Sequence, residues 1–232
     1  MTKTLLLTFI LMTFISFCPQ KKYAGRILYK VTLRPIDKPK NLEIDKIPNE
    51  DRQKAQAIIQ NIKAVDFLLI FNNNESIYKV IEKMDSEADS KINLAKSVAG
   101  GDDIYYSNNQ TNSSFYQKED GGELWLVNYK KEIWNLTQET KNIGNYLCYK
   151  AILGKQNNFA WYAPEIPVNF GPKNYHGLPG LVLEVQIGGL NIKATEIILN
   201  PNEQILIKKP IKGIEIEQEA FLKKFKEFFK GF

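Results

Sequence analysis

The sequence predicts a single-domain α+β protein: one large antiparallel β-meander curled into an open half-barrel, with one internal and one C-terminal helix packed against it. Short segments of alternating apolar and polar residues follow one another, with Gly, Asn or Pro turns between them. This spacing leaves no room for crossover helices, so consecutive strands should be antiparallel neighbours. The 232 residues are 44% hydrophobic and 12% aromatic, which is enough for one sizeable core.

The first segment of the chain differs in kind from the rest. Lys3 gives a short basic start, residues 5–17 form an apolar and hydroxyl run, and polar Gln20-Lys21-Lys22 follows. This pattern is typical of an export signal, and the apolar run is too short to span a bilayer comfortably. We therefore divide the chain into an export signal at 1–18 and a single β-rich domain at 19–232, and we expect no transmembrane helix in the mature protein.

The two cysteines give information on the cellular location of the protein. Cys18 is either the lipid-modified first residue of a bacterial lipoprotein or part of a signal cleaved nearby, and bulky Phe17 and Pro19 disfavour the first alternative. The expected location is therefore the periplasm, the outer membrane or the medium. Cys148 is then the remaining cysteine, so it cannot form an intramolecular disulfide, and we expect it to be a small buried hydrophobe.

The charge pattern argues against one class of partner. The formal charge is +5, but the lysines alternate with acids and form no block. We therefore expect no nucleic-acid partner.

The elements of the first half follow from local patterns. A helix is predicted over 50–62, because Asn49 can cap it and Ala55, Ile58, Ile59 and Ile62 form one apolar stripe. The polar segment 84–103 is expected to be the least ordered. Strands are predicted at 23–33, 65–71, 76–81, 104–107, 114–117 and 123–129.

The second half contains more strands and one long loop. The segment 163–179 should be a shaped loop, because Pro164, Pro167 and Pro172 each remove a ladder donor. A helix is predicted over 217–229, with Phe221, Leu222, Phe225, Phe228 and Phe229 on one face. Strands are predicted at 133–136, 140–143, 146–153, 158–162, 181–187, 191–199 and 204–208.

The stretch His176-Gly177-Leu178-Pro179-Gly180-Leu181-Val182-Leu183 predicts a turn around which the loop is organised. Pro179 suits the second position of a type II turn, and Gly180 can take the positive φ that the third position requires. We expect the residues from Gly177 to Val182 to fix the loop on the sheet, with Leu178 and Leu181 in the core.

Three segments carry a resemblance to a known family. They are Thr-Lys-Asn-Ile-Gly-Asn-Tyr-Leu-Cys-Tyr-Lys-Ala at 140–151, Ala-Trp-Tyr-Ala-Pro-Glu-Ile-Pro at 160–167, and the segment from Gly171-Pro172 to Val182. Over 140–185 the chain resembles the GLPGLI family of exported proteins from Bacteroidetes-type bacteria, with Val182 in place of the final Ile. The resemblance implies a cell-envelope protein of Bacteroidetes without an established activity.

Candidate site residues gather near this turn. Trp161, Tyr162, Tyr175 and His176 are the candidate ligand residues on the concave sheet face, but a packed structural role is the favoured interpretation of each. His176 is the only histidine. With one His and one Cys in the mature chain we expect no metal site, and without a recognised motif we assign no catalytic residue and no cofactor.

Two functions follow as hypotheses. The first is a non-enzymatic binding or accessory protein that uses the concave face and the loop 164–180 to bind a lipid, a peptide or an outer-membrane protein. The alternative is an exported hydrolase in which His176 acts with a nearby carboxylate, Glu165 or Glu184.

Overall fold

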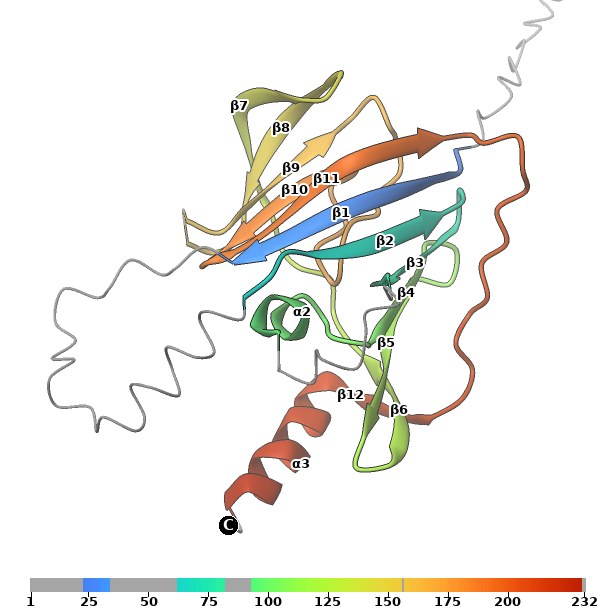
Figure 1. Ribbon diagram of the computed structural model, residues 1–232, viewed down its shortest axis with the longest axis vertical. Coiled ribbons are helices and arrows are strands. Elements are labelled where there is room, and N and C mark those ends of the chain that lie inside the picture. Colours follow the sequence, from blue (N-terminus) through green and yellow to red (C-terminus); the bar gives the residue numbers. More distant parts are fainter. Residues whose placement is uncertain (1–22, 34–61, 82–92, 156, 231–232) are drawn as a thin grey trace, which may run out of the picture.

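The computed structural model describes residues 23–33, 62–81, 93–155 and 157–230, with side chains described up to residue 224 in the last range. These residues form one open twelve-stranded sheet, not closed into a barrel, and two helices (Figure 1). The predicted fold class is confirmed, with strand far outweighing helix. The helix predicted at 50–62 lies almost entirely outside the described residues.

Two meanders make up the sheet, whose strand order is β12-β6-β5-β4-β3-β2-β1-β11-β10-β9-β8-β7. The first contains β1 (Gly25–Leu33), β2 (Val65–Phe71), β3 (Glu75–Val80), β4 (Ile104–Asn108), β5 (Ser113–Asp120) and β6 (Glu123–Asn128). The second contains β7 (Asn135–Ile143), β8 (Tyr146–Ile152), β9 (Phe159–Ala163), β10 (Leu181–Ile187) and β11 (Leu190–Leu199).

The two meanders meet where β1 pairs antiparallel with β11, from Gly25 opposite Leu199 to Leu33 opposite Leu190. The prediction of one unbroken meander is therefore wrong at the step from β6 to β7, which are not neighbours. The central pairing places the buried side chains of β1 within one continuous core, which no local pattern could have shown. Those side chains are Ile27, Tyr29 and Val31.

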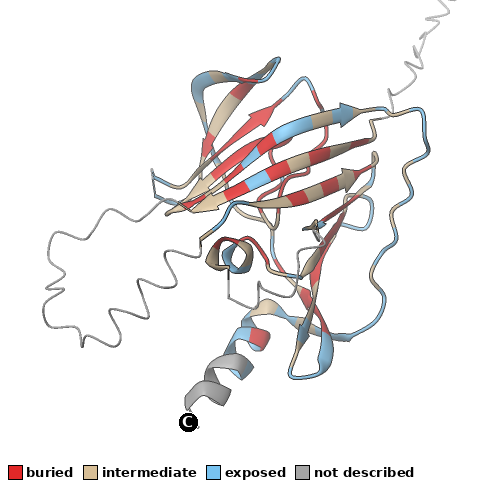
Figure 2. Cartoon of the chain, viewed as in Figure 1, coloured by how far each residue is buried: buried red, intermediate tan, exposed pale blue. Residues whose placement is uncertain are grey.

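One face of the sheet, here called the inner face, carries most of the core. Alternate residues of each strand point to it, as the pleat requires, and they include Tyr29, Phe67 and Tyr78. The Phe67 and Tyr78 rings stack with centroids 5.0 Å apart. Figure 2 shows this alternation of buried and more exposed residues along β1 and β2.

The segment 164–180, here called the proline loop, covers part of the inner face. Its side chains Ile166, Phe170 and Leu178 are buried, and the Phe170 ring lies 6.1 Å from that of Phe71 on β2. The loop also bonds to β10, because Ile166 and Phe170 carbonyls accept from the backbone N–H groups of Leu181 and Val182, each at 3.0 Å. The chain itself therefore fills much of this face.

The turn at the end of the proline loop differs from the predicted type II turn. The Leu178 carbonyl accepts from the Gly180 N–H at 2.8 Å, which is a tighter three-residue turn, because the loop residue Ile166 binds the Leu181 N–H instead. Gly180 does have a positive φ, of 157°. Leu178 and Leu181 are both buried in the core, as predicted.

Several elements correct the sequence prediction. No strand forms over 204–208, because this segment crosses a face of the sheet without pairing along an edge; instead β12 (Ile214–Glu217) pairs parallel to β6. The strands predicted at 133–136 and 140–143 are largely one strand, β7, with a register shift between Leu136 and Thr140. A short helix, α2 (Leu94–Val98), forms within the segment expected to be the least ordered, capped by the Asn93 side chain.

The C-terminal helix forms as predicted, as α3 (Gln218–Lys230). Phe221 is buried with its ring 5.9 Å from that of Trp125 on β6, whereas Leu222 is about half exposed. The predicted Phe225, Phe228 and Phe229 side chains lie outside the described ones. Within the described part of the chain, neither helix has the length and apolar character needed to span a bilayer.

Candidate binding site

His176 lies at the centre of a buried polar cluster. Its side chain is 3% exposed, and its Nε2 atom lies 3.3 Å from both the Ser107 Oγ and the Tyr129 hydroxyl. The Ser107 Oγ is in turn 3.3 Å from the Ser114 Oγ, and the Trp134 indole N–H donates to the His176 carbonyl at 3.1 Å. Strands β4, β5 and the end of β6 thus hold the proline loop through this residue.

Burial decides the charge of the cluster. Desolvation, helped by nearby Lys131, lowers the pKa of His176 from 6.5 to about 4, so the ring is neutral at pH 7. Burial also raises the pKa of Tyr129 well above its ordinary value. The cluster is therefore an uncharged network of hydroxyls around a neutral imidazole.

A serine beside a histidine is also the pair used in nucleophilic catalysis, but such a pair normally needs a third group that orients the base. Among the described residues, no carboxylate is a hydrogen-bond partner of the His176 ring. Glu184 instead lies 2.9 Å from the Lys141 amine, and Glu165 is exposed. The geometry brings His176 together with hydroxyls and not with the two acids considered in the hydrolase alternative.

The structure separates the other predicted site residues. Trp161 and Tyr162 lie on β9, where the Lys141 amine sits 4.5 Å from the Trp161 ring centroid and Tyr162 packs 6.2 Å from Tyr149. All four candidate residues are buried, so they do not form one exposed ligand surface. Of the four, Tyr175 lines the pocket described next.

This pocket, here called the inner pocket, has a volume of about 330 Å³. Its walls come from the inner face of β4 and β5, from Tyr129 directly after β6, from the end of α2, from the end of the proline loop and from the start of α3. The lining residues that carry its chemistry are Asp103, Lys118, Lys173, Tyr105, Tyr116 and Tyr175. An adjoining hollow of about 640 Å³ shares Asp103 and Lys118 and extends towards Gly121-Gly122.

The inner pocket holds two amines and one carboxyl group. The Lys118 amine lies 3.2 Å from the Asp103 carboxylate, and the Lys173 amine donates to the Val98 carbonyl at 3.1 Å. Burial raises the pKa of Asp103, opposed by Lys118, and lowers the pKa of Lys173, opposed by Asp103 and then Glu132. Burial also raises the pKa of Tyr116 to about 12, so its hydroxyl stays protonated.

Sequence reasoning missed the charged residues of the inner pocket. A signal existed for Lys118, because it continues the alternation of Ser114 and Tyr116 and so had to share their face. Asp103 directly precedes β4 in the sequence, and this position also indicated that its side chain lies near the sheet. Lys173 had no comparable signal, because its position depends on the path of the proline loop, where it adopts a φ of 55°.

The described residues define a mainly β protein with an open sheet, a covered inner face and a small polar pocket beside the covering loop. No group of three or more His, Cys, Asp or Glu side chains in this part of the chain is placed to hold a metal ion.

A family model matches residues 155–184, and it is described as a protein of unknown function (Porph_ging). The matched segment runs from the end of the β8–β9 turn through the proline loop into β10. This model, named for Porphyromonas gingivalis, is consistent with a Bacteroidetes family and assigns no activity. No curated protein matches the sequence.

Two similar solved structures are described as "Structure of PNGF-II in C2 space group" and "Structure of PNGF-II in P21 space group". Both have a TM-score of 0.52, with 17% and 16% sequence identity respectively, and both matches cover 87% of this chain. They cover 32% of the other chain, so the present chain spans about a third of the length of PNGF-II. At this identity the likeness shows the fold alone.

Proposed function

We propose that this protein is an exported, non-enzymatic binding protein of the cell envelope that holds a small peptide-like ligand in the inner pocket. Export is supported by the signal pattern at 1–18, and a Bacteroidetes envelope origin is consistent with the family model over 155–184. The protein would act in the periplasm, at the outer membrane or in the medium.

The observation that carries the proposal is the composition of the inner pocket. Two amines, of Lys118 and Lys173, stand beside the single carboxyl group of Asp103, so the lining favours a ligand with a negative charge. A terminal carboxylate suits the amines, and an amide or amine N–H suits Asp103. The rings of Tyr105 and Tyr116, 5.2 Å apart, offer an apolar wall for a side chain.

The size of the pocket fits the same ligand class. Its volume of about 330 Å³ is at the lower end of the roughly 300–1,000 Å³ that small-molecule sites occupy. A dipeptide or tripeptide end can enter such a space, whereas a folded partner would contact only its rim. The adjoining hollow beside Asp103 and Lys118 gives a longer ligand room to continue.

The hydrolase alternative has weaker support. His176 is buried within a network of hydroxyl groups and does not line the inner pocket, so it lacks solvent access, and it has no orienting carboxylate among the described residues. A ligand in the inner pocket would contact Tyr175 and not the imidazole. Binding without chemistry is therefore the function that we propose.

Calorimetric titration with short peptides tests the proposal. Dipeptides and tripeptides with an aromatic or aliphatic last residue and a free carboxylate should bind, and their amidated forms should bind at least tenfold more weakly, because a charge-assisted hydrogen bond contributes about 1.5–3 kcal/mol. Lys118→Gln and Lys173→Gln should each weaken binding by about 10- to 100-fold for the same reason.

Lys193→Gln is the matched control, because Lys193 is exposed on β11 away from the inner pocket. Circular dichroism of each variant verifies that the fold is intact. Equal affinity for free and amidated peptides, equal affinity of all variants, or no binding by any peptide of the set would each refute the proposal.

A further inference from the structure

The segment 204–213, here called the strap, joins the end of β11 to β12 across the outer face of the sheet (Figure 1). Ile207 of the strap packs on the small outer core of β3 to β6, and the Gln117 side chain donates to the Lys212 carbonyl at 2.7 Å. The outer core consists of Ile77, Tyr106, Phe115 and Leu126. The strap is thus held at two points along its length.

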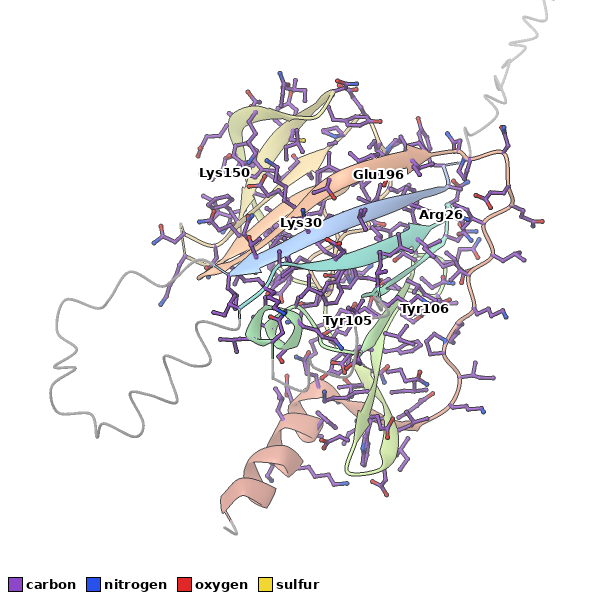
Figure 3. The ribbon with its side chains drawn as sticks, in the orientation of Figure 1. Arg26, Lys30, Tyr105, Tyr106, Lys150 and Glu196 are labelled. Atoms are coloured by element: carbon purple, nitrogen blue, oxygen red, sulfur yellow. The ribbon has the colours of Figure 1, made fainter. Side chains whose placement is uncertain are left out.

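The strap and the inner pocket lie on opposite faces of the same strands. Tyr105 and Tyr116 line the inner pocket, whereas Tyr106 and Phe115 belong to the outer core beneath the strap. Successive residues of a strand point to opposite faces, so both sites can be occupied at once. Figure 3 labels Tyr105 and Tyr106, which are neighbours on β4.

Large apolar side chains of the strap remain in solvent. Leu206 is 74% exposed and Ile211 is 78% exposed, which is unusual for two such residues on one short segment. Both border a groove of about 540 Å³, whose floor contains Ile70, Ile77 and Ile104 of the outer face. Figure 2 shows the strap as a largely exposed segment.

The charged residues that line this groove are all positive. Four lysines line it, and its lining residues contain no carboxylate. Lys209 leans over the outer core, with its amine 5.8 Å from both the Tyr106 and the Phe115 ring centroids. An apolar groove whose charged lining residues are all lysines is complementary to an apolar layer beneath negative headgroups. The four lysines are Lys79, Lys208, Lys209 and Lys212.

The N-terminal side of the chain enters the fold next to the strap. The Asn200 side chain accepts from the Ala24 N–H at 3.0 Å, and the Asn200 N–H donates to the Ala24 carbonyl at 2.7 Å. Arg26, labelled in Figure 3, forms an ion pair of 2.7 Å with Glu203, directly before the strap.

We infer that the strap is a membrane-docking element that binds the surface of an anionic phospholipid bilayer. Leu206 and Ile211 enter the boundary between headgroups and acyl chains, while the amines of Lys208, Lys209 and Lys212 contact the phosphates. The inner pocket then faces away from the membrane and stays open to its ligand. This inference does not depend on what the inner pocket binds.

Vesicle co-sedimentation of the naturally processed protein tests the inference. Binding is compared between vesicles of pure phosphatidylcholine and vesicles in which half of the lipid is phosphatidylglycerol, so an acyl anchor, if present, contributes to both. The wild type should prefer the anionic vesicles. Replacing the three strap lysines by Gln should lower that preference on the order of 100-fold, because each lysine near an anionic surface contributes about fivefold.

The apolar contribution is tested separately. Leu206→Asn and Ile211→Asn should each weaken partitioning into anionic vesicles by about tenfold, in line with partial burial of one large aliphatic side chain. Ile133→Asn is the matched apolar control, because Ile133 is 84% exposed in the segment before β7. The matched charge control replaces three exposed lysines outside the strap by Gln: Lys30, Lys155 and Lys193.

The outcomes separate clearly. Loss of binding in the strap variants with retention in both controls supports the inference. Equal binding to the two kinds of vesicle, or equal loss in strap and control variants, overturns it. Binding of free oleate or of an acidic peptide that depends on the strap, without binding to vesicles, also overturns it and assigns the groove to that soluble ligand.

Discussion

Substitution of Gly180 by Ala is the sharpest test of how the proline loop is fixed to the sheet. A Cβ atom at this position would lie 2.4 Å from the Ala163 carbonyl oxygen and 2.8 Å from the Pro164 nitrogen. Real Cβ contacts essentially never fall below 3.0 Å, and both neighbours are backbone atoms. The two ends of the proline loop, at Gly180 and at the Ala163–Pro164 junction with β9, therefore have to move apart to accommodate the methyl group.

The expected cost has two parts. Forcing an extra methyl group into a packed site costs about 1–3 kcal/mol, and a positive φ on a residue with a Cβ costs about 1–3 kcal/mol. Together they predict a loss of about 2–6 kcal/mol, a large share of the roughly 5–15 kcal/mol that stabilises a typical domain. Gly180→Val should cost at least as much.

Two other glycines with positive φ serve as controls that separate the cost of the close Cβ contact from the cost of backbone strain. Gly177 has a φ of 90° with the Lys131 side chain as its nearest neighbour at 3.9 Å, and Gly144 has a φ of 56° with no atom within 4 Å. Their Ala variants should lose only the backbone part. In urea titrations followed by tryptophan fluorescence, the midpoint of Gly180→Ala should lie about 0.5–2 M below both controls, given slopes of about 1–3 kcal/mol/M. Three coincident midpoints would refute the argument.

Two further predictions concern the same region. Leu178→Ala should lower the free energy of unfolding by about 2–5 kcal/mol in urea titration, because the Leu178 side chain is buried in the core. The exposed control Lys193→Ala should stay within about 0.5 kcal/mol of the wild type. Equal urea midpoints for the two variants would contradict a core role of Leu178. The lowered pKa of His176 means that the unfolded chain, with a pKa of 6.5, binds the proton first, so stability should fall as the pH drops from 6.5 to about 4. Relative to His176→Gln, the wild type should lose on the order of 3 kcal/mol between pH 7 and pH 4, and parallel pH profiles of the two proteins would argue against a buried neutral ring.

Local sequence patterns predicted most of the strands. The physical reason is that the formation of a strand depends largely on the residues next to one another in the sequence. Alternation along residues 23–33 and 181–187 corresponds to β1 and β10, because the pleat alone places successive side chains on opposite faces. The positive φ of Gly180 followed from the proline before it and the short turn around it. Where a pattern was weak, prediction failed: the exposed segment Ile-Glu-Ile-Glu of β12 became a strand only because β6 offered a free edge.

The candidate site depended far more on tertiary structure. Ser107, Tyr129 and His176 come from distant parts of the chain, so neither their contact nor the absence of a carboxylate partner among the described residues could be read from spacing. Asp103 and Lys118 meet because β4 and β5 pair. Lys173 joins them through the path of the proline loop.

The sequence by itself thus determined the class of fold, the position of the long loop and the positive φ of Gly180, since periodicity, proline geometry and glycine freedom act over a few residues. Only the tertiary structure decided that β1 pairs with β11, that the loop covers the inner face, and that the strap leaves Leu206 and Ile211 in solvent. These features are set by which distant surfaces bury one another, and burial is a property of the whole folded chain.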